Sequence, residues 1–164
     1  KSHMFPVLFI GILLAGCSAS SSTSRKEQKA ARYEQTSALI EGGNYLYTVR
    51  SASPTGARTI QITSTYTLEV KEGIYKLIFP ISADHSIPVT VETGGVFEGE
   101  PSDLSVTKNE KKQTLTVKFK ISNKEENYEC QLLVTASGNA TLTVTSSKRQ
   151  VISYYGEVTK PGAA

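Results

Sequence analysis

Apolar and polar residues alternate with a period of two over most of the chain after Gly43. A β-strand places successive side chains on opposite faces, so this pattern predicts strands with one buried and one solvated face. Consecutive strands keep the same face apolar, which is the pattern of an antiparallel meander. The expected fold is mainly β with one N-terminal helix (α+β). Its meander would form a curved sheet, a sandwich or a partly open barrel.

A two-residue loop at Glu72-Gly73 predicts a hairpin. Apolar residues on its two sides then face one another in three pairs, which are Val70 with Tyr75, Leu68 with Leu77, and Tyr66 with Phe79. Ile60 and Ile62 share the parity of the apolar residues before the loop. Residues 58–71 are therefore expected to form one long strand.

Three more loops extend the apolar face through four consecutive strands. They are expected over Asn109–Lys112, Asn123–Glu126 and Ser137–Asn139. The pairs they predict are Val106 with Leu115, Leu104 with Val117, Phe119 with Cys130, Val117 with Leu132, Leu142 with Val134 and Val144 with Leu132. Further strands are expected over Asn44–Ala52 and Gln150–Val158.

The segment Arg25–Gly43 predicts the single helix. It consists largely of good helix formers, and Gly42-Gly43 supplies a stop signal. Residues at helical spacing form one narrow apolar stripe, made of Ala30, Tyr33, Ser37 and Ile40. We expect this stripe to pack against the sheet.

Residues 1–16 have the features of a lipoprotein signal peptide. The apolar run Phe5–Ala15 is too short to span a bilayer, which takes roughly 20 residues. Its end, Leu14-Ala15-Gly16-Cys17, resembles the lipobox of bacterial lipoproteins. Cys17 is thus the expected lipid attachment residue, residues 17–25 a Ser-rich tether, and residues 26–160 one domain. The alternative is an ordinary secretory signal in which the cysteine is incidental.

The charge pattern argues against a nucleic-acid partner. The chain has 18 Lys+Arg and 15 Asp+Glu, and the two signs alternate along it. The densest runs, Lys26–Lys29 and Asn109–Lys112, are interpreted as solvated faces. Cys130 shares the apolar parity of its strand, which predicts a buried free thiol.

The longest stretch without a strand pattern runs from Pro80 to Pro101 and is the expected binding loop. Its candidate binding residues are Asp84, His85, Phe97, Glu98 and Glu100. Neighbouring residues of a strand point to opposite faces, so Asp84, His85 and Ser86 do not form a catalytic triad by themselves. One histidine and one free cysteine after the signal peptide favour no transition-metal site. No cofactor is expected.

The segment Ser137–Val158, read with Ala38–Tyr47, Ala52–Arg58 and Leu77–Pro80, resembles domain-of-unknown-function family 4251. The resemblance covers about Arg32 to Val158. Its most specific residues are Gly138, Ala140, Arg149, Ile152-Ser153-Tyr154 and Gly156. It implies a secreted lipoprotein of Bacteroides-type bacteria and assigns no functional residues, and the segment after Pro80 departs from the family pattern.

Three functional hypotheses follow from these features. The leading one is a non-enzymatic lipoprotein of the outer membrane, anchored at Cys17 and facing the periplasm. Its domain would bind an envelope protein or a small-molecule ligand. The alternative is a hydrolase acting on envelope glycans, with Glu98, Glu100 or Asp103 as its acids. The third is a structural spacer.

Overall fold

The computed structural model describes residues 21–56, 58–63, 65–80, 94–122, 127–146 and 151–162. This part of the chain contains one helix and ten strands. The elements are α1 (Ser21–Glu41), β1 (Asn44–Pro54), β2 (Ile60–Gln61), β3 (Thr67–Lys71), β4 (Ile74–Pro80), β5 (Gly94–Gly99), β6 (Ser102–Asn109), β7 (Thr114–Ser122), β8 (Asn127–Thr135), β9 (Asn139–Ser146) and β10 (Ile152–Thr159).

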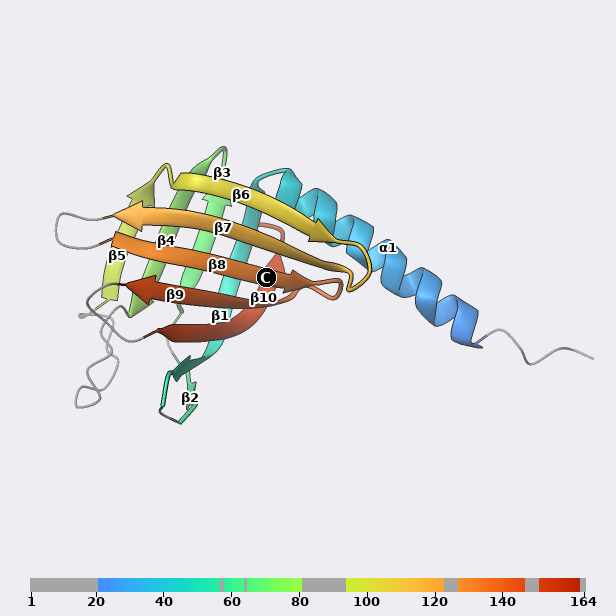
Figure 1. Ribbon diagram of the computed structural model, residues 1–164, viewed down its shortest axis with the longest axis horizontal. Coiled ribbons are helices and arrows are strands. Elements are labelled where there is room, and N and C mark those ends of the chain that lie inside the picture. Colours follow the sequence, from blue (N-terminus) through green and yellow to red (C-terminus); the bar gives the residue numbers. More distant parts are fainter. Residues whose placement is uncertain are drawn as a thin grey trace, which may run out of the picture.

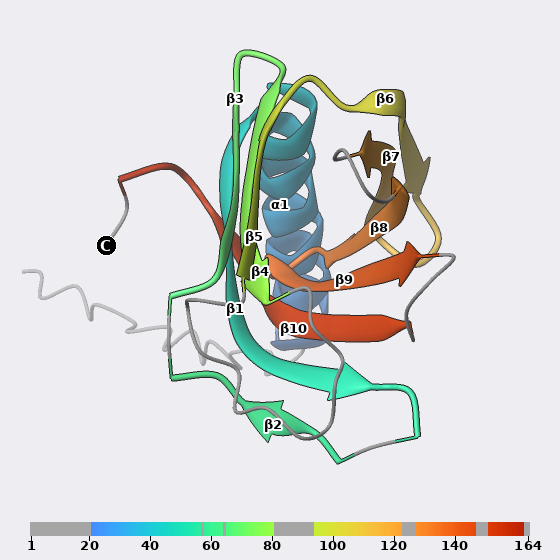
Figure 2. The ribbon, with the colours of Figure 1, turned by 90° about the vertical axis from the view of Figure 1, so that its left-hand side faces the viewer.

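The strands form one antiparallel sheet in the order β5-β4-β3-β1-β10-β9-β8-β7-β6, and β2 pairs with β1 outside this path. In Figure 1 strands β6–β9 lie in front of β1 and β3–β5. Figure 2 shows the sheet curled into a half-barrel, with α1 between its two sides. The mainly β fold with one N-terminal helix is thus confirmed, and the sheet is curled rather than split into a sandwich.

Helix α1 begins at Ser21, four residues before the expected start, so the end of the predicted tether is helical. It ends at Glu41, and Gly42 and Gly43 follow as expected; Gly43 has a φ of 61°. Tyr33, Ser37 and Ile40 are buried, whereas Ala30 is exposed. Only the C-terminal half of α1 therefore packs inside the half-barrel, and its first turns project beyond the sheet (Figure 1).

The predicted hairpin at Glu72-Gly73 is present. The two residues have φ values of 53° and 83°, as a type I′ turn requires. Val70 pairs with Tyr75 and Leu68 with Leu77, as expected. The third expected pair, Tyr66 with Phe79, is not part of the described ladder, because β3 begins at Thr67, one residue after Tyr66.

The single strand expected over residues 58–71 is wrong. Its two ends pair with different parts of β1, β2 with Ser51-Ala52 and β3 with Asn44–Thr48. The register changes between them, since the Ile62 N–H donates to the Arg50 carbonyl and the Val49 N–H to the Tyr66 carbonyl. This break lies beside an irregularity in β1 between Val49 and Ser51. Ile60 is consequently exposed instead of lying in the core.

Two other expected registers are wrong by two residues, while that of β7 and β8 is confirmed. Val106 pairs with Val117 instead of Leu115, and Leu132 pairs with Leu142 instead of Val144. Leu104 lies where the register of β6 shifts, between Ser102 and Ser105. An even shift keeps the same side chains on the same face, so the apolar face of β7–β9 was predicted and the partners were not. Leu104 and Val106 of the edge strand β6 are exposed instead of buried.

Positive φ values explain where these turns close. Gln113, with φ 54°, ends the β6–β7 loop, and Gly138, with φ 86°, ends the β8–β9 loop. The loops are therefore residues 110–113 and 136–138, each displaced by one residue from the expected position.

The core fills the inside of the half-barrel and is rich in tyrosine. Tyr75 of β4 and Phe119 of β7 join its two sides, with 4.8 Å between ring centroids. Tyr47 donates a hydrogen bond of 2.7 Å to the carbonyl of Tyr154, also in the core. All described core residues lie between Tyr33 and Val158. A chain that starts at Ser18 thus keeps this core complete.

Candidate functional site

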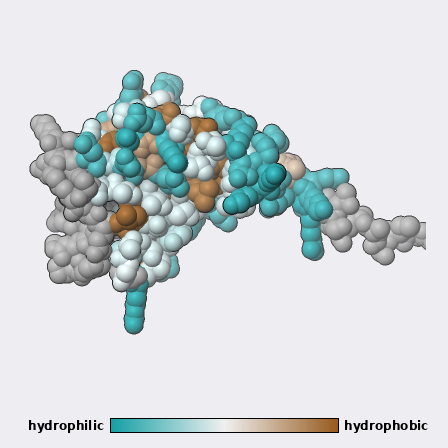
Figure 3. Space-filling view, viewed as in Figure 1, coloured by the Kyte–Doolittle hydropathy of each residue, from teal (hydrophilic) through white to brown (hydrophobic). Residues whose placement is uncertain are grey.

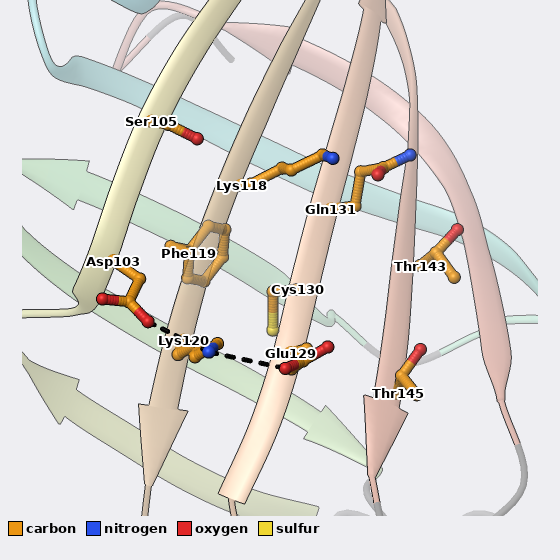
Figure 4. Close-up of a pocket in the computed structure, with 10 residues that line it drawn as sticks. All are labelled: Asp103, Ser105, Lys118, Phe119, Lys120, Glu129, Cys130, Gln131, Thr143 and Thr145. Carbon is orange, nitrogen blue, oxygen red and sulfur yellow. Dashed lines mark ion pairs between the residues drawn. The ribbon is translucent and has the colours of Figure 1, made fainter.

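A shallow hollow of about 390 Å³ lies on the outer face of strands β6–β9 (Figure 4). Phe119 and Cys130 form its floor with their backbone, because their side chains point into the core. The polar residues around it alternate with such buried residues and therefore point outward. We call this set the outer-face site, and it consists of Asp103, Ser105, Lys118, Lys120, Glu129, Gln131, Thr143 and Thr145.

The strand register arranges these side chains in two rows. The first row crosses four strands and consists of Ser105, Lys118, Gln131 and Thr143. The second row consists of Lys120, Glu129 and Thr145. Directly opposed residues have Cβ atoms about 5 Å apart, so neighbours within a row can contact the same ligand.

Lys120 lies between two carboxylates. Its Nζ is 3.0 Å from Asp103 Oδ2 and 3.5 Å from Glu129 Oε1 (Figure 4). The hydrogen bond to Asp103, together with the charges of Asp103 and Glu129, raises the pKa of the Lys120 ammonium. Lys120 is therefore shared between Asp103 and Glu129, and its charge offsets only part of the negative charge of these two acids.

The first row has the free hydrogen-bonding groups. Among the described residues, neither Lys118 nor Gln131 has an ion-pair or hydrogen-bond partner. The two side chains lie next to each other on β7 and β8 (Figure 4). The ammonium of Lys118, the amide of Gln131 and the hydroxyl of Ser105 are thus available to one ligand, whereas the Thr143 hydroxyl lies 3.5 Å from Ser153 Oγ, within hydrogen-bond distance.

An apolar strip adjoins this row on the same outer face. Leu133, Thr141 and Tyr155 lie opposite one another across β8, β9 and β10. Tyr155 is 43% exposed, whereas Tyr154 is buried, as their opposite parity predicts. Figure 3 shows that most of this face is hydrophilic, with small hydrophobic patches.

The described members of the sequence-predicted binding set, Phe97, Glu98 and Glu100, do not line this site. Asp84 and His85 lie outside the described residues. Part of the stretch expected to be irregular is strand β5, whose ladder with β4 sets Phe97 opposite Leu77. Phe97 is half-buried against the core, so it has a packing role. The expectation failed because pairing with a formed neighbouring strand outweighs the low strand preference of the glycines at its ends.

The predicted acids lie on two consecutive strands and the short connection between them. Glu98 of β5 pairs with Lys76 at 3.2 Å, and Glu100 is exposed after the strand. Asp103 of β6 pairs with Lys120 of β7 at 3.0 Å. Glu98 and Asp103 are each held in an ion pair with a lysine, which offers no support for the hydrolase alternative. The outer-face site was missed, although its signal was present in the outward positions of successive strands.

Cys130 is buried and free, as predicted. Burial raises the pKa of its thiol to about 12, so it stays protonated and unreactive at neutral pH. In the part of the chain that the structure covers, no three His, Cys, Asp or Glu side chains are grouped to hold a metal ion. The described helix is also not apolar enough to cross a bilayer. Cys17 lies outside the described residues.

Comparison with known proteins identifies a matching family and a solved structure of similar fold. A family model named DUF4251, a domain of unknown function, matches residues 27–158. The crystal structure of a DUF4251 family protein from Bacteroides eggerthii is similar, with 18% sequence identity and a TM-score of 0.61. The match covers 81% of this chain and 92% of that one. At this identity the likeness is one of fold. No curated protein matches the chain.

Proposed function

Because this chain belongs to the DUF4251 family, a domain of unknown function, we propose its role from its own surface and sequence: a non-catalytic envelope lipoprotein that binds a hydroxyl-rich ligand, such as an envelope glycan. The ligand would occupy the outer-face site. A lipid on Cys17 would anchor the protein in an outer membrane, and the domain would face the periplasm.

The first row of the outer-face site carries the binding proposal. Lys118 and Gln131 are exposed, adjacent and without partners among the described residues, and hydroxyls lie on either side of them. Hydrogen-bonding groups of this kind fix the orientation of a polar ligand. Tyr155 offers an exposed ring two strands away, against which the apolar face of a sugar can pack.

The sequence supports the anchor. Cys17 follows Leu14-Ala15-Gly16 at the end of an apolar run, as lipid attachment requires. Ser18 follows the cysteine and residues 18–24 contain no acidic residue, which favours a periplasm-facing position in the outer membrane. The membrane would then be one partner through the lipid, and the envelope glycan the other.

The binding proposal is tested by isothermal titration of the chain Ser18–Ala164 with soluble glycan fragments from the cell envelope. We expect the double variant Lys118→Ala/Gln131→Ala to bind at least about tenfold more weakly, because each lost hydrogen bond costs roughly 1 kcal/mol. The matched control is Lys71→Ala/Gln61→Ala, which removes the same groups at exposed positions outside the site. Absence of glycan binding, or an equal loss in both variants, would contradict the proposal.

The anchor is tested in cells with globomycin, which inhibits the lipoprotein signal peptidase. Uncleaved precursor should accumulate in its presence. The Cys17→Ser variant should lose its lipid and leave the membrane fraction. Normal processing under globomycin would refute lipid attachment. Protease treatment of intact cells then tests orientation, because digestion without lysis would place the domain outside the cell.

A further inference from the structure

A groove of about 460 Å³ lies between the N-terminal half of α1 and two turns at the end of the sheet. Four cationic side chains line it, Arg25, Lys29 and Arg32 from α1 and Lys112 from the β6–β7 loop. We call these four residues the basic groove. The other described polar side chains of the lining are amides and hydroxyls, all of which can donate hydrogen bonds, and none is a carboxylate.

Tertiary contacts hold the two walls of this groove together. The Thr36 hydroxyl donates a buried hydrogen bond of 3.1 Å to the carbonyl of Ala136, in the β8–β9 turn. The Tyr33 hydroxyl lies 3.5 Å from Glu110 Oε1, which draws the acid of the β6–β7 loop toward the packed part of the helix. The helix and both turns are therefore positioned by the core, and the groove does not depend on its ligand for its shape.

The groove unites the two densest charge runs of the sequence. Lys26–Lys29 and Asn109–Lys112 were interpreted as separate solvated faces, yet Lys29 and Lys112 line the same groove. No ion pair involves any of the four cations among the described residues. Their charge is thus uncompensated at close range, as in sites that bind phosphate groups.

We propose that the basic groove docks the domain on the anionic, phosphate-bearing headgroups of the membrane that holds Cys17. This inference rests on the proposed lipid anchor. Arg25 follows Cys17 by eight residues, so even an extended chain would keep it within about 29 Å of the anchor. Lysines and arginines close to an anionic surface add to the affinity that a lipid anchor supplies. The first turns of α1 also project beyond the sheet on this side (Figure 1).

Vesicle co-sedimentation of the unlipidated chain Ser18–Ala164 measures this docking. We expect binding to vesicles of phosphatidylglycerol and phosphatidylcholine, and not to phosphatidylcholine alone. Neutralising the helix cations in Arg25→Gln/Lys29→Gln/Arg32→Gln should weaken binding about 100-fold. The matched control is Arg58→Gln/Lys71→Gln/Lys160→Gln, which removes the same charge at exposed positions outside the groove. Circular dichroism verifies that both variants are folded.

An equal loss in both triple variants would overturn the proposal, since net charge alone would then drive binding. Equal binding to uncharged vesicles would also overturn it. Displacement by inorganic phosphate at constant ionic strength would identify the groove as a site for a soluble anion instead. Because the chain tested carries no lipid, the result is independent of the globomycin experiment, and either can fail alone.

Discussion

The carbonyl oxygen of Thr48 occupies the space that a side chain on Gly156 would need, since a Cβ at Gly156 would lie 1.9 Å from it. Gly156 pairs with Val49 at the point where the register of β1 and β10 shifts. Gly156→Ala must therefore push the two strands apart, and we expect it to lower the free energy of unfolding by more than about 2 kcal/mol. Urea unfolding of the chain Ser18–Ala164 measures this.

Gly99→Ala is the control, because its Cβ would make an ordinary contact of 3.6 Å with the ring of Phe97. We expect a change below about 1 kcal/mol there. Equal costs at both positions would show that β1 and β10 are not in close contact at Gly156.

The tyrosine hydroxyls of the core predict two opposite outcomes for the same substitution. Tyr47→Phe removes the donor to the Tyr154 carbonyl and should cost about 1–3 kcal/mol of unfolding free energy. Tyr66→Phe removes a buried hydroxyl that has no hydrogen-bond partner among the described residues, so it should be neutral or stabilising. Thermal and urea unfolding compare the two, and a larger loss for Tyr66→Phe would refute the assignment.

The β3–β4 turn should not tolerate a β-branched residue at its second position. Gly73 has a φ of 83°, so Gly73→Val should cost more than about 1 kcal/mol. Lys71→Val introduces the same residue at an exposed strand position and should change stability little. Urea unfolding tests both variants, and an unaffected Gly73→Val would contradict the type I′ turn.

The two faces of β3 should respond differently to alanine. Leu68 is fully buried opposite Leu77, so Leu68→Ala should cost roughly 2–5 kcal/mol. Glu69 points to the other face opposite Lys76, and Glu69→Ala should cost less than about 0.5 kcal/mol. If chemical denaturation shows equal losses, β3 is buried on both faces.

The buried thiol predicts a loss of stability at alkaline pH. Burial raises the pKa of Cys130 from 9.0 to about 12, so between these values the unfolded chain releases a proton that the folded chain retains. The free energy of unfolding should then fall with rising pH, by up to about 1.4 kcal/mol per unit from this group. Burial also raises the pKa values of Tyr45, Tyr47 and Tyr154, which act in the same direction at higher pH.

Cys130→Val isolates the contribution of the thiol. Urea unfolding of both proteins at pH values around 8 to 9 should show a shallower decline for the variant, because tyrosines of the unfolded chain are still largely protonated there. Parallel declines would mean that Cys130 is ionised or solvated in the folded protein.

The candidate site was less predictable than the fold. The strand pattern shows that Lys118 and Gln131 point outward. That they are neighbours follows only from the register of β7 and β8, and that they have no partners among the described residues follows only from the positions of the surrounding side chains. Lys29 and Lys112 are far apart in the sequence. They line a common groove because contacts of Tyr33 and Thr36 hold the helix against two turns. Residues 94–99 form a strand instead of the expected irregular stretch, because this glycine-containing edge strand is stabilised by its partner β4.

The sequence alone determined which side chains face inward on most strands, because a strand alternates its side chains with a period of two and the apolar residues follow that period. Ile60, Leu104 and Val106 are exposed in spite of this pattern. The sequence also determined the helix stop at Gly42-Gly43 and the turn at Glu72-Gly73, which depend on local backbone geometry. Only the tertiary structure decided the two shifted registers, the division of residues 58–71 and the close approach of Gly156 to Thr48. A shift of two residues leaves the hydrophobic pattern unchanged, so only contacts between strands distant in sequence distinguish one pairing from the other.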